Sequence, residues 1–370
     1  MQITLLDHHK NADASFIDNP KVEITFGNEE SDYYLNLKDK VNTDYDLVLF
    51  EQNVDAVIST IVYYLNTKKE PDIECIYKHI SKDKFQKYID DKKKNIFALN
   101  TLKIYGSDLE DIEKIYLLNP HETGLANISI SHILYKSVDN PSPFIRDLVG
   151  LAIAADYTME NCLDTMLEII KSYKDIFPCL FDRIQDLSLN KFNLLDSKLG
   201  ELTRMFWSPV MLEGDEGAYK LINNILSSNE FNYHDLFKTC DNPAVNFIKE
   251  SYEKFSEILN REKSRFNEQK IVDGKIFIYE PEYQSENFIR EFSNIIKDEN
   301  LFNIIVMKVK KDDGATKYSI RRGKLDVDIG GVLHQMEAGG GNPFAGGGTV
   351  ANEEKFESEF KKHINRILPD

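Results

Sequence analysis

The sequence YSIRRGKLDVDIGGVL, residues 318–333, is followed five residues later by GGGNPFAGGG, residues 339–348. Two adjacent arginines stand in the first segment, and glycine makes up most of the second. Consecutive glycines let a backbone approach a phosphate closely and present N–H groups to it. The alternative is a charged hairpin face followed by a flexible glycine loop. The closeness of the two segments favours an anion-binding site.

Residues 308–324 hold seven Lys or Arg against Asp312 and Asp313, a local charge of +5 in a chain with a formal net charge of −17. A protein this acidic does not coat duplex DNA non-specifically, because phosphate binding needs clustered cations. Nucleic-acid contact is therefore expected only at this local patch, while acidic surface elsewhere favours a basic protein partner. The candidate nucleic-acid-binding residues are Lys317, Arg321, Arg322, Gly339, Gly340, Gly341 and Asn342.

The first half of the chain alternates short apolar strands with helical segments. Strands are predicted at residues 2–6, 21–26, 46–50, 73–77, 96–99 and 114–118. These segments are rich in Ile, Val and aromatic residues and are bounded by polar residues. Strands that are apolar on both faces and alternate with helices predict an α/β fold with a parallel sheet.

A length of 370 residues suits two domains of roughly 150 residues each. We predict a parallel-sheet domain at 1–190, a helical linker region at 191–268 and a smaller α/β domain at 269–370. Pro and Gly at 208–217 break the helical pattern and predict a hinge or linker. Asp-Gly pairs at 273–274 and 313–314 predict two hairpins in the last part.

Composition narrows the class of protein. The longest uncharged apolar run, at 148–155, is far shorter than the roughly 18 residues of a membrane span, so no membrane association is expected. No basic segment followed by an apolar one opens the chain, so we expect no export signal. The four cysteines form no Cys-x-x-Cys pair, which argues against a zinc site and for a reducing, cytoplasmic environment.

A second set of polar residues stands at the carboxyl ends of predicted strands, the edge where α/β sheets bind ligands. The segment HHKNADAS, residues 8–15, supplies His9 and Asp13, a nitrogen and oxygen ligand pair suited to Mn²⁺. The alternative there is a solvated turn with Asn and Asp as helix caps. Further candidates at the same edge are Glu51, His79, His121 and Asp156.

Together these segments resemble the DHH superfamily of phosphoesterases, in its RecJ-like branch with a DHH-associated C-terminal domain. HHKNADAS resembles the first metal-binding motif, and residues 119–158 resemble the region that ends in the fourth motif at Asp156. Residues 318–348 resemble the arginine strand and the Gly-Gly-Gly-His-x-x-Ala-Ala-Gly loop of the C-terminal domain. The resemblance runs nearly end to end and implies a two-domain protein with a metal-dependent phosphodiesterase site.

The tripeptide that names the superfamily occurs here as Asp7-His8-His9, but the family carries it as the third motif. The order of the segments instead places the second motif's aspartate at Glu51 or Gln52 and the third motif at Tyr77-Lys78-His79. Two ions about 4 Å apart need several carboxylates to hold them. Because Tyr77 and Lys78 remove a carboxylate and add an ammonium group, a two-metal centre is not expected. Asn342 also replaces the histidine of the C-terminal loop.

We therefore expect a degenerate RecJ-like protein, inactive or weakly active, that serves as a replication or repair factor. The resemblance extends to helicase cofactors that join GINS and the MCM ring, which implies a partner of that kind besides single-stranded nucleic acid. No cofactor is then required, or a single Mn²⁺ or Mg²⁺ held by His9, Asp13, Glu51 and Asp156. The alternative is an Mn²⁺-dependent single-strand exonuclease or small phosphodiesterase that uses His79 and His121 as catalytic residues. A scaffold that binds neither metal nor nucleic acid is the third hypothesis.

Overall fold

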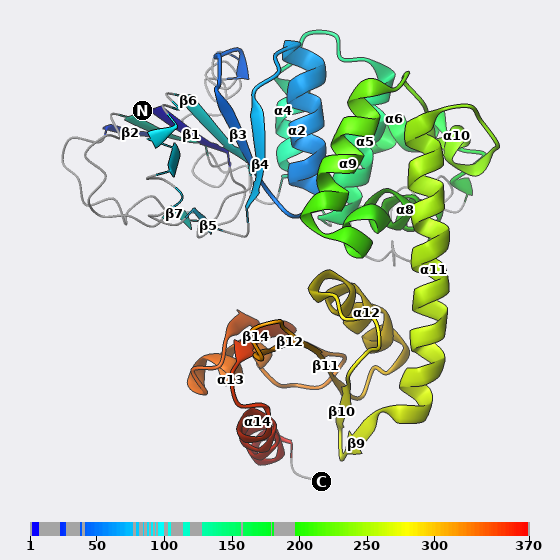
Figure 1. Ribbon diagram of the computed structural model, residues 1–370. Coiled ribbons are helices and arrows are strands. Elements are labelled where there is room, and N and C mark those ends of the chain that lie inside the picture. Colours follow the sequence, from blue (N-terminus) through cyan, green and yellow to red (C-terminus); the bar gives the residue numbers. More distant parts are fainter. Residues whose placement is uncertain are drawn as a thin grey trace. The chain divides into compact units, whose positions relative to one another are not determined.

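The structure of the chain is a computed structural model (Figure 1). It describes residues 2–6, 23–26, 38, 41–76, 79–80, 84, 87–88, 90–91, 93, 95–99, 103–104, 114–118, 128–156, 158–178, 180 and 197–368. The chain divides into two compact units, Met1–Glu250 and Ser251–Asp370, and helix α11 (Pro243–Gln269) contributes to both. No helix in these ranges is long and apolar enough to cross a membrane.

The first unit is built on a six-stranded sheet in the order β2-β8-β1-β6-β3-β4, in which all neighbouring strands are parallel. The strands are β1 (Gln2–Leu6), β2 (Glu23–Phe26), β3 (Leu47–Glu51), β4 (Asp72–Ile76), β6 (Asn95–Leu99) and β8 (Lys114–Leu118). All five residues of β3 are buried, as expected of a parallel strand covered on both faces. The predicted α/β fold with a parallel sheet is confirmed. A separate pair joins β5 (His79–Ile80) to β7 (Lys103–Ile104).

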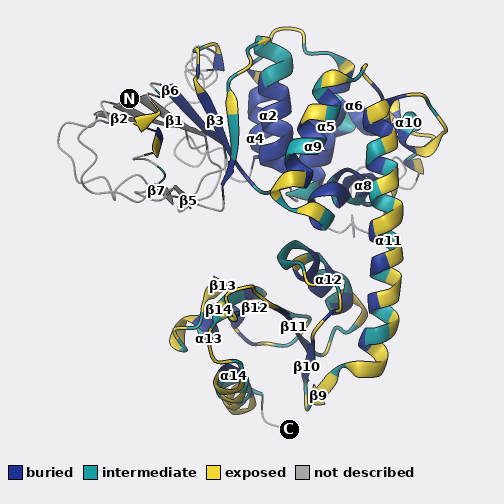
Figure 2. Ribbon diagram, viewed as in Figure 1, coloured by how far each residue is buried: buried dark blue, intermediate teal, exposed yellow. Residues whose placement is uncertain are grey.

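Helices pack on this sheet through contacts with β3 and β6, and Figure 2 shows the dark-blue, buried residues of these helices. They are α2 (Val54–Thr67), α4 (Ile130–Lys136), α5 (Pro143–Ala155), α6 (Leu163–Ser172), α8 (Lys198–Glu213), α9 (Asp215–Ser227) and α10 (Tyr233–Phe237). Helix α2 begins where Asn53 Oδ1 accepts a hydrogen bond from the Ala56 N–H at 2.7 Å. It ends at Lys68, which has left-handed backbone angles.

A buried carboxylate joins α2 to α4. Asp55 is fully buried and accepts hydrogen bonds from the N–H groups of Ile130 (2.7 Å) and Ser131 (3.0 Å) and from the Ser129 hydroxyl (2.6 Å). It therefore satisfies N–H groups at the start of α4 that the helix itself leaves unpaired.

His132 lies in the same helix and is 4% exposed. Its Nδ1 is buried without a hydrogen-bond partner among the described residues. Burial lowers the pKa of His132 to about 4; Asp164 of α6 and Asp55 of α2 oppose this effect, and Lys136 adds to it. The imidazole is therefore neutral in the folded protein at neutral pH.

The hinge or linker expected at residues 208–217 is reduced to a single turn, so the break in the helical pattern is found but a separate linker segment is not. Helix α8 continues past Pro209 to Glu213, and the chain turns only at Gly214, where φ is 61°. Helix α8 packs on α5, and α9 packs on α2 and α8. A Cβ atom on Gly217 of α9 would lie 2.1 Å from the carbonyl oxygen of Pro209 in α8. The absence of a side chain at Gly217 therefore lets α8 and α9 approach closely. The division of the chain at 1–190, 191–268 and 269–370 stays a prediction.

The second unit has a six-stranded sheet in the order β13-β14-β12-β11-β10-β9. Its strands are β9 (Ile271–Asp273), β10 (Ile276–Tyr279), β11 (Ile304–Lys310), β12 (Thr316–Arg322), β13 (Gly340–Asn342) and β14 (Ala345–Val350). Only the β10–β11 pair is parallel. The two predicted Asp-Gly hairpins are confirmed, with positive φ at Gly274 and Gly314.

Helices cover both faces of this sheet. Helix α12 (Glu286–Glu299) packs on β11 and β12, and its Ser293 hydroxyl lies 3.0 Å from that of Ser319. Tyr318 and Ile320 point to the opposite face, because successive strand residues alternate. There they form a core with α13 (Ile329–Gln335) and α14 (Glu353–Ile367).

Candidate functional site

The carboxyl edge of the parallel sheet in the first unit carries Glu51, which is 7% exposed. Its Oε2 accepts a hydrogen bond from Asn53 Nδ2 at 2.7 Å. The next side chain, Gln52, donates from Nε2 to Asp215 Oδ1 at 2.6 Å. Asp215 is the first residue of α9. A second carboxylate, more than 160 positions later in the chain, therefore reaches the edge where Glu51 was predicted to act.

Cys75 of β4 belongs to the same edge. Its N–H donates to the Tyr219 hydroxyl at 2.7 Å. Burial raises the pKa of the Cys75 thiol, and the nearby Asp215 raises it further. The thiol is therefore protonated at neutral pH and is a poor metal ligand or nucleophile. Sequence analysis missed Asp215 and Tyr219, because nothing in their local pattern separates them from ordinary residues of a surface helix.

Of the six predicted metal or catalytic residues, the structure describes Glu51, His79 and Asp156. Asp156 caps α5 with φ −90° and ψ 0°, and its N–H donates to Ala152 O at 3.0 Å. His79 begins β5. His9, Asp13 and His121 lie outside the described residues. In the described part of the chain no group of three or more His, Cys, Asp or Glu side chains is arranged to hold a metal ion. The convergence of the six residues stays a prediction.

The basic patch of the second unit is smaller than the sequence suggests. Lys308 is 8% exposed and pairs with Glu357 at 2.9 Å and with Glu353. Lys310 also pairs with Glu353, and Lys311 lies 3.3 Å from a carboxylate oxygen of Glu286. Helices α12 and α14 thus neutralise three of the seven cations counted in residues 308–324.

Arg321 is half-buried beneath α12, and its guanidinium donates hydrogen bonds to neutral oxygen atoms. Its Nε donates to Asn294 Oδ1 at 2.7 Å, and its Nη1 donates to the carbonyls of Ile320 at 2.9 Å and Gly346 at 3.5 Å. Burial, together with the nearby Arg290, lowers the pKa of Arg321 to about 10, and the nearby Glu291 opposes this effect. The guanidinium stays charged at neutral pH. Because only some of its five N–H donors are used, it can still donate to an anion.

Arg322 points to the other face of the sheet. Its Nε donates to Pro343 O at 2.8 Å, and its Nη1 donates to Leu325 O. Its guanidinium carbon lies 4.5 Å from the centre of the Phe344 ring. Neutral carbonyls and an aromatic ring thus hold this cation, and its positive charge stays available to a ligand.

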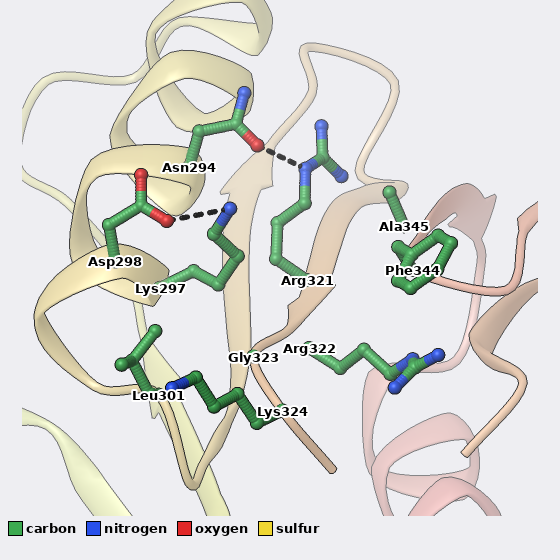
Figure 3. Close-up of a pocket in the computed structure, with 10 residues that line it drawn as sticks. All are labelled: Asn294, Lys297, Asp298, Leu301, Arg321, Arg322, Gly323, Lys324, Phe344 and Ala345. Atoms are coloured by element: carbon green, nitrogen blue, oxygen red, sulfur yellow. Dashed lines mark hydrogen bonds and ion pairs between the residues drawn. The ribbon is translucent and has the colours of Figure 1, made fainter. Parts of the chain in front are cut away.

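These two arginines line a pocket of about 330 Å³ at the end of β12 (Figure 3). The pocket is also lined by Asn294, Lys297, Asp298, Leu301, Gly323, Lys324, Phe344 and Ala345. Lys297 pairs with Asp298 at 2.7 Å. Four cationic side chains therefore share the pocket with one carboxylate, an arrangement that suits an anion such as phosphate.

The glycine-rich segment forms an ordered hairpin, β13 to β14, and is not a flexible loop. A Cβ on Gly341 would lie 2.1 Å from Ala345 O, and one on Gly339 would lie 2.2 Å from Gly347 O. Close backbone approach explains these glycines. Gly340 alone among the three faces open space.

Asn342 closes the turn of this hairpin. Its Oδ1 accepts hydrogen bonds from the N–H groups of Phe344 and Ala345, both at 2.9 Å. Of the predicted nucleic-acid-binding residues, the pocket includes Arg321 and Arg322. It does not include Lys317, Gly339, Gly340, Gly341 or Asn342. Sequence analysis missed Asn294, Lys297 and Phe344, which only the fold brings to the arginines.

The fold is similar to those of several solved structures. No family model matches the sequence, and no curated protein matches it. Among solved structures, RecJ of Thermus thermophilus in complex with Mn²⁺ matches with 11% identity and a TM-score of 0.57, over 100% of this chain and 63% of that one. This chain therefore spans less than two thirds of that RecJ.

Two further structures match over most of both chains. CDC45 from Entamoeba histolytica matches with 7% identity and a TM-score of 0.52, over 92% of this chain and 99% of that one. The DHH domain of a member of a ribosomal protein family matches with 10% identity and a TM-score of 0.55, over 90% of this chain and 89% of that one. The chain is thus an α/β protein of two compact units. More narrowly, its fold is similar to those of RecJ, CDC45 and a DHH domain, as the sequence resemblance predicted.

Proposed function

We propose that this chain is a RecJ-like binding factor that holds single-stranded nucleic acid in its second unit and cleaves it weakly or not at all. The observation that carries the proposal is the pocket at the end of β12, where Arg321 and Arg322 are held by neutral groups beside two lysines. A cationic groove is the usual electrostatic requirement for binding a strand through its phosphates.

The weak or absent chemistry is proposed from the sequence of the first unit. Tyr77-Lys78-His79 stands where the superfamily carries Asp-His-His, which removes a carboxylate and adds a positive charge. Since metal ions in such a site are held by negative ligands, the change lowers the affinity for a second ion. We propose that no cofactor is required, and that at most one Mn²⁺ or Mg²⁺ binds, through His9, Asp13, Glu51 and Asp156.

A protein partner is the second part of the proposal. The formal net charge of −17 favours association with a basic protein surface. The RecJ-like fold shared with CDC45 supports a partner among GINS or replicative helicase components. The proposed location is the cytoplasm.

The alternative function is a phosphodiesterase or exonuclease with one metal ion, in which His79 and His121 transfer protons. The specific observation in its favour is Glu51, a buried carboxylate at the edge where an α/β sheet binds ligands. The RecJ structure with a matching fold contains Mn²⁺.

The melting temperature of the first unit in Mn²⁺ separates the two functions. Its transition can be followed through the fluorescence of the one tryptophan, Trp207 in α8. We expect no shift in up to about 1 mM Mn²⁺, because a single ion held by the remaining ligands would bind too weakly to stabilise the fold at that concentration. A site with a Kd of about 10 μM would instead stabilise the folded state by about 2.7 kcal/mol at that concentration. A shift that disappears in Asp156→Ala would favour the enzyme.

A further inference from the structure

We infer that Phe344 is a base-stacking residue, so that the pocket selects strands whose bases are unpaired. The inference rests on the proposed function and names the part of the ligand that the site recognises besides phosphate. The Phe344 side chain is 61% exposed at the tip of the β13–β14 turn.

The turn that carries the ring is held firmly. The Phe344 N–H donates to Asn342 Oδ1 at 2.9 Å, and the Phe344 carbonyl accepts from the Arg322 N–H at 3.0 Å. Arg322 itself is fixed by the Pro343 and Leu325 carbonyls. An aromatic ring already in place loses little conformational entropy when a ligand stacks on it.

One face of the ring is already covered. The Arg322 guanidinium carbon lies 4.5 Å from the ring centre, and Figure 3 shows the two side chains together at the same side of the pocket. Because the residue remains 61% exposed, much of the ring surface is accessible to a ligand. A planar group can stack there, while the cations behind the ring bind the attached phosphate.

An exposed phenylalanine beside a cation is not by itself a site. Phe237 of the first unit is 39% exposed and has Lys198 Nζ 5.1 Å from its ring centre. Phe344 differs because it lines a pocket that also contains Lys297, Lys324 and Arg321. A nucleotide supplies the two complementary groups, a flat base and an anion, at adjacent positions.

Stacking on Phe344 requires a base with a free face. In a duplex both faces of a base are covered by its neighbours, whereas in a single strand a base can turn outward onto an aromatic ring. The pocket volume of about 330 Å³ is at the small end of the range for ligand sites. It suits one nucleotide unit of a longer strand.

The test compares two labelled oligonucleotides of equal length, oligo(dT) and its abasic analogue, which has the same phosphates but no bases. The full chain is titrated against each, and the Kd is measured by fluorescence anisotropy. For wild type we expect oligo(dT) to bind about tenfold more tightly than the abasic strand. Phe344→Ala should bind oligo(dT) about tenfold less tightly than wild type does. Its affinity for the abasic strand should equal that of wild type, because the Pro343 and Leu325 carbonyls still hold Arg322. Phe344→Trp should keep the preference, and the matched control Phe237→Ala should behave as wild type.

Two outcomes would overturn the inference while leaving the proposed function in place. If Phe344→Ala weakens binding to both strands equally, the ring only supports the phosphate site. If Phe344→Ala leaves the affinity for both strands unchanged but weakens binding to a protein partner, the ring is part of a protein-binding surface. In both cases Arg321→Glu with Arg322→Glu would still abolish strand binding. Wild-type protein that binds neither oligonucleotide would instead contradict the proposed function itself.

Discussion

Replacing Arg321 and Arg322 together by glutamate is expected to weaken binding to a single strand at least about 100-fold. The change removes two cations that are held beside the pocket by neutral groups and adds two anions in their place. A hydrogen bond to a charged group contributes about 1.5–3 kcal/mol, and a tenfold change in affinity corresponds to about 1.4 kcal/mol. The slope of affinity against salt concentration should also fall, because fewer counterions are released on binding.

A matched control separates this local effect from the change in net charge. Lys254→Glu with Lys355→Glu alters the charge by the same amount at two exposed positions of the second unit. It should weaken binding far less. Because Arg321 also contacts Asn294, the single variant Lys324→Glu serves as a check at an exposed position of the pocket and should weaken binding without loss of structure. Unchanged affinity in a folded double arginine variant would refute the assignment of this pocket.

The first unit should lose stability as the pH falls below about 6.5, and His132 should account for roughly 3 kcal/mol of the loss by pH 4. Its pKa is lowered from 6.5 to about 4 in the folded protein, chiefly by burial. Between these two values the unfolded chain binds a proton at His132 and the folded chain does not, so acid favours the unfolded state. The slope from this one group is about 1.4 kcal/mol per pH unit, and it is absent above about pH 6.5.

Urea unfolding followed by Trp207 fluorescence at pH values from about 7 down to about 4 measures this effect. His132→Gln removes the titrating group, so the free energy of unfolding of the variant should depend less on pH across this window. His334→Gln, at an exposed position of the second unit, is the matched control and should follow wild type. If His132→Gln and wild type show the same pH dependence, His132 is not held neutral by burial.

The six strands of the first sheet could be predicted well from the sequence, because each is a short apolar run with a clear boundary. β13 and β14 of the second sheet lie in the glycine-rich segment and were not predicted. β3 is a good example: all five of its residues are buried, so the continuous apolar pattern is a direct consequence of its central position. The Asp-Gly hairpins were equally clear, because the left-handed backbone at Gly274 and Gly314 is a local requirement.

The predictions that failed depended on contacts distant in sequence. Residues 208–217 were expected to form a hinge or linker, but Pro209 lies within α8, which packs on α5. The basic patch was counted as +5, but Lys308 and Lys310 are paired with Glu353, more than 40 positions away. No local pattern in the sequence shows which cations a later helix will neutralise.

The residues of the candidate site likewise divide into those that could be predicted from their neighbours in sequence and those that only the fold brings together. Arg321 and Arg322 were identified from their neighbours in sequence, and they do line the pocket. Asn294, Lys297 and Phe344 were missed because they reach the arginines only through the packing of α12 and the turn between β13 and β14. Asp215 reaches Gln52 in the same way, through the packing of α9 on α2.

The central claim is that a RecJ-like fold here binds a strand without cutting it. An end-labelled single-stranded oligonucleotide, incubated with stoichiometric purified chain and Mn²⁺, tests this directly when binding and strand length are measured in the same samples. The strand is expected to be bound and to remain full length, in wild type and in Asp156→Ala alike. Robust Mn²⁺-dependent cleavage by wild type that Asp156→Ala abolishes would contradict it.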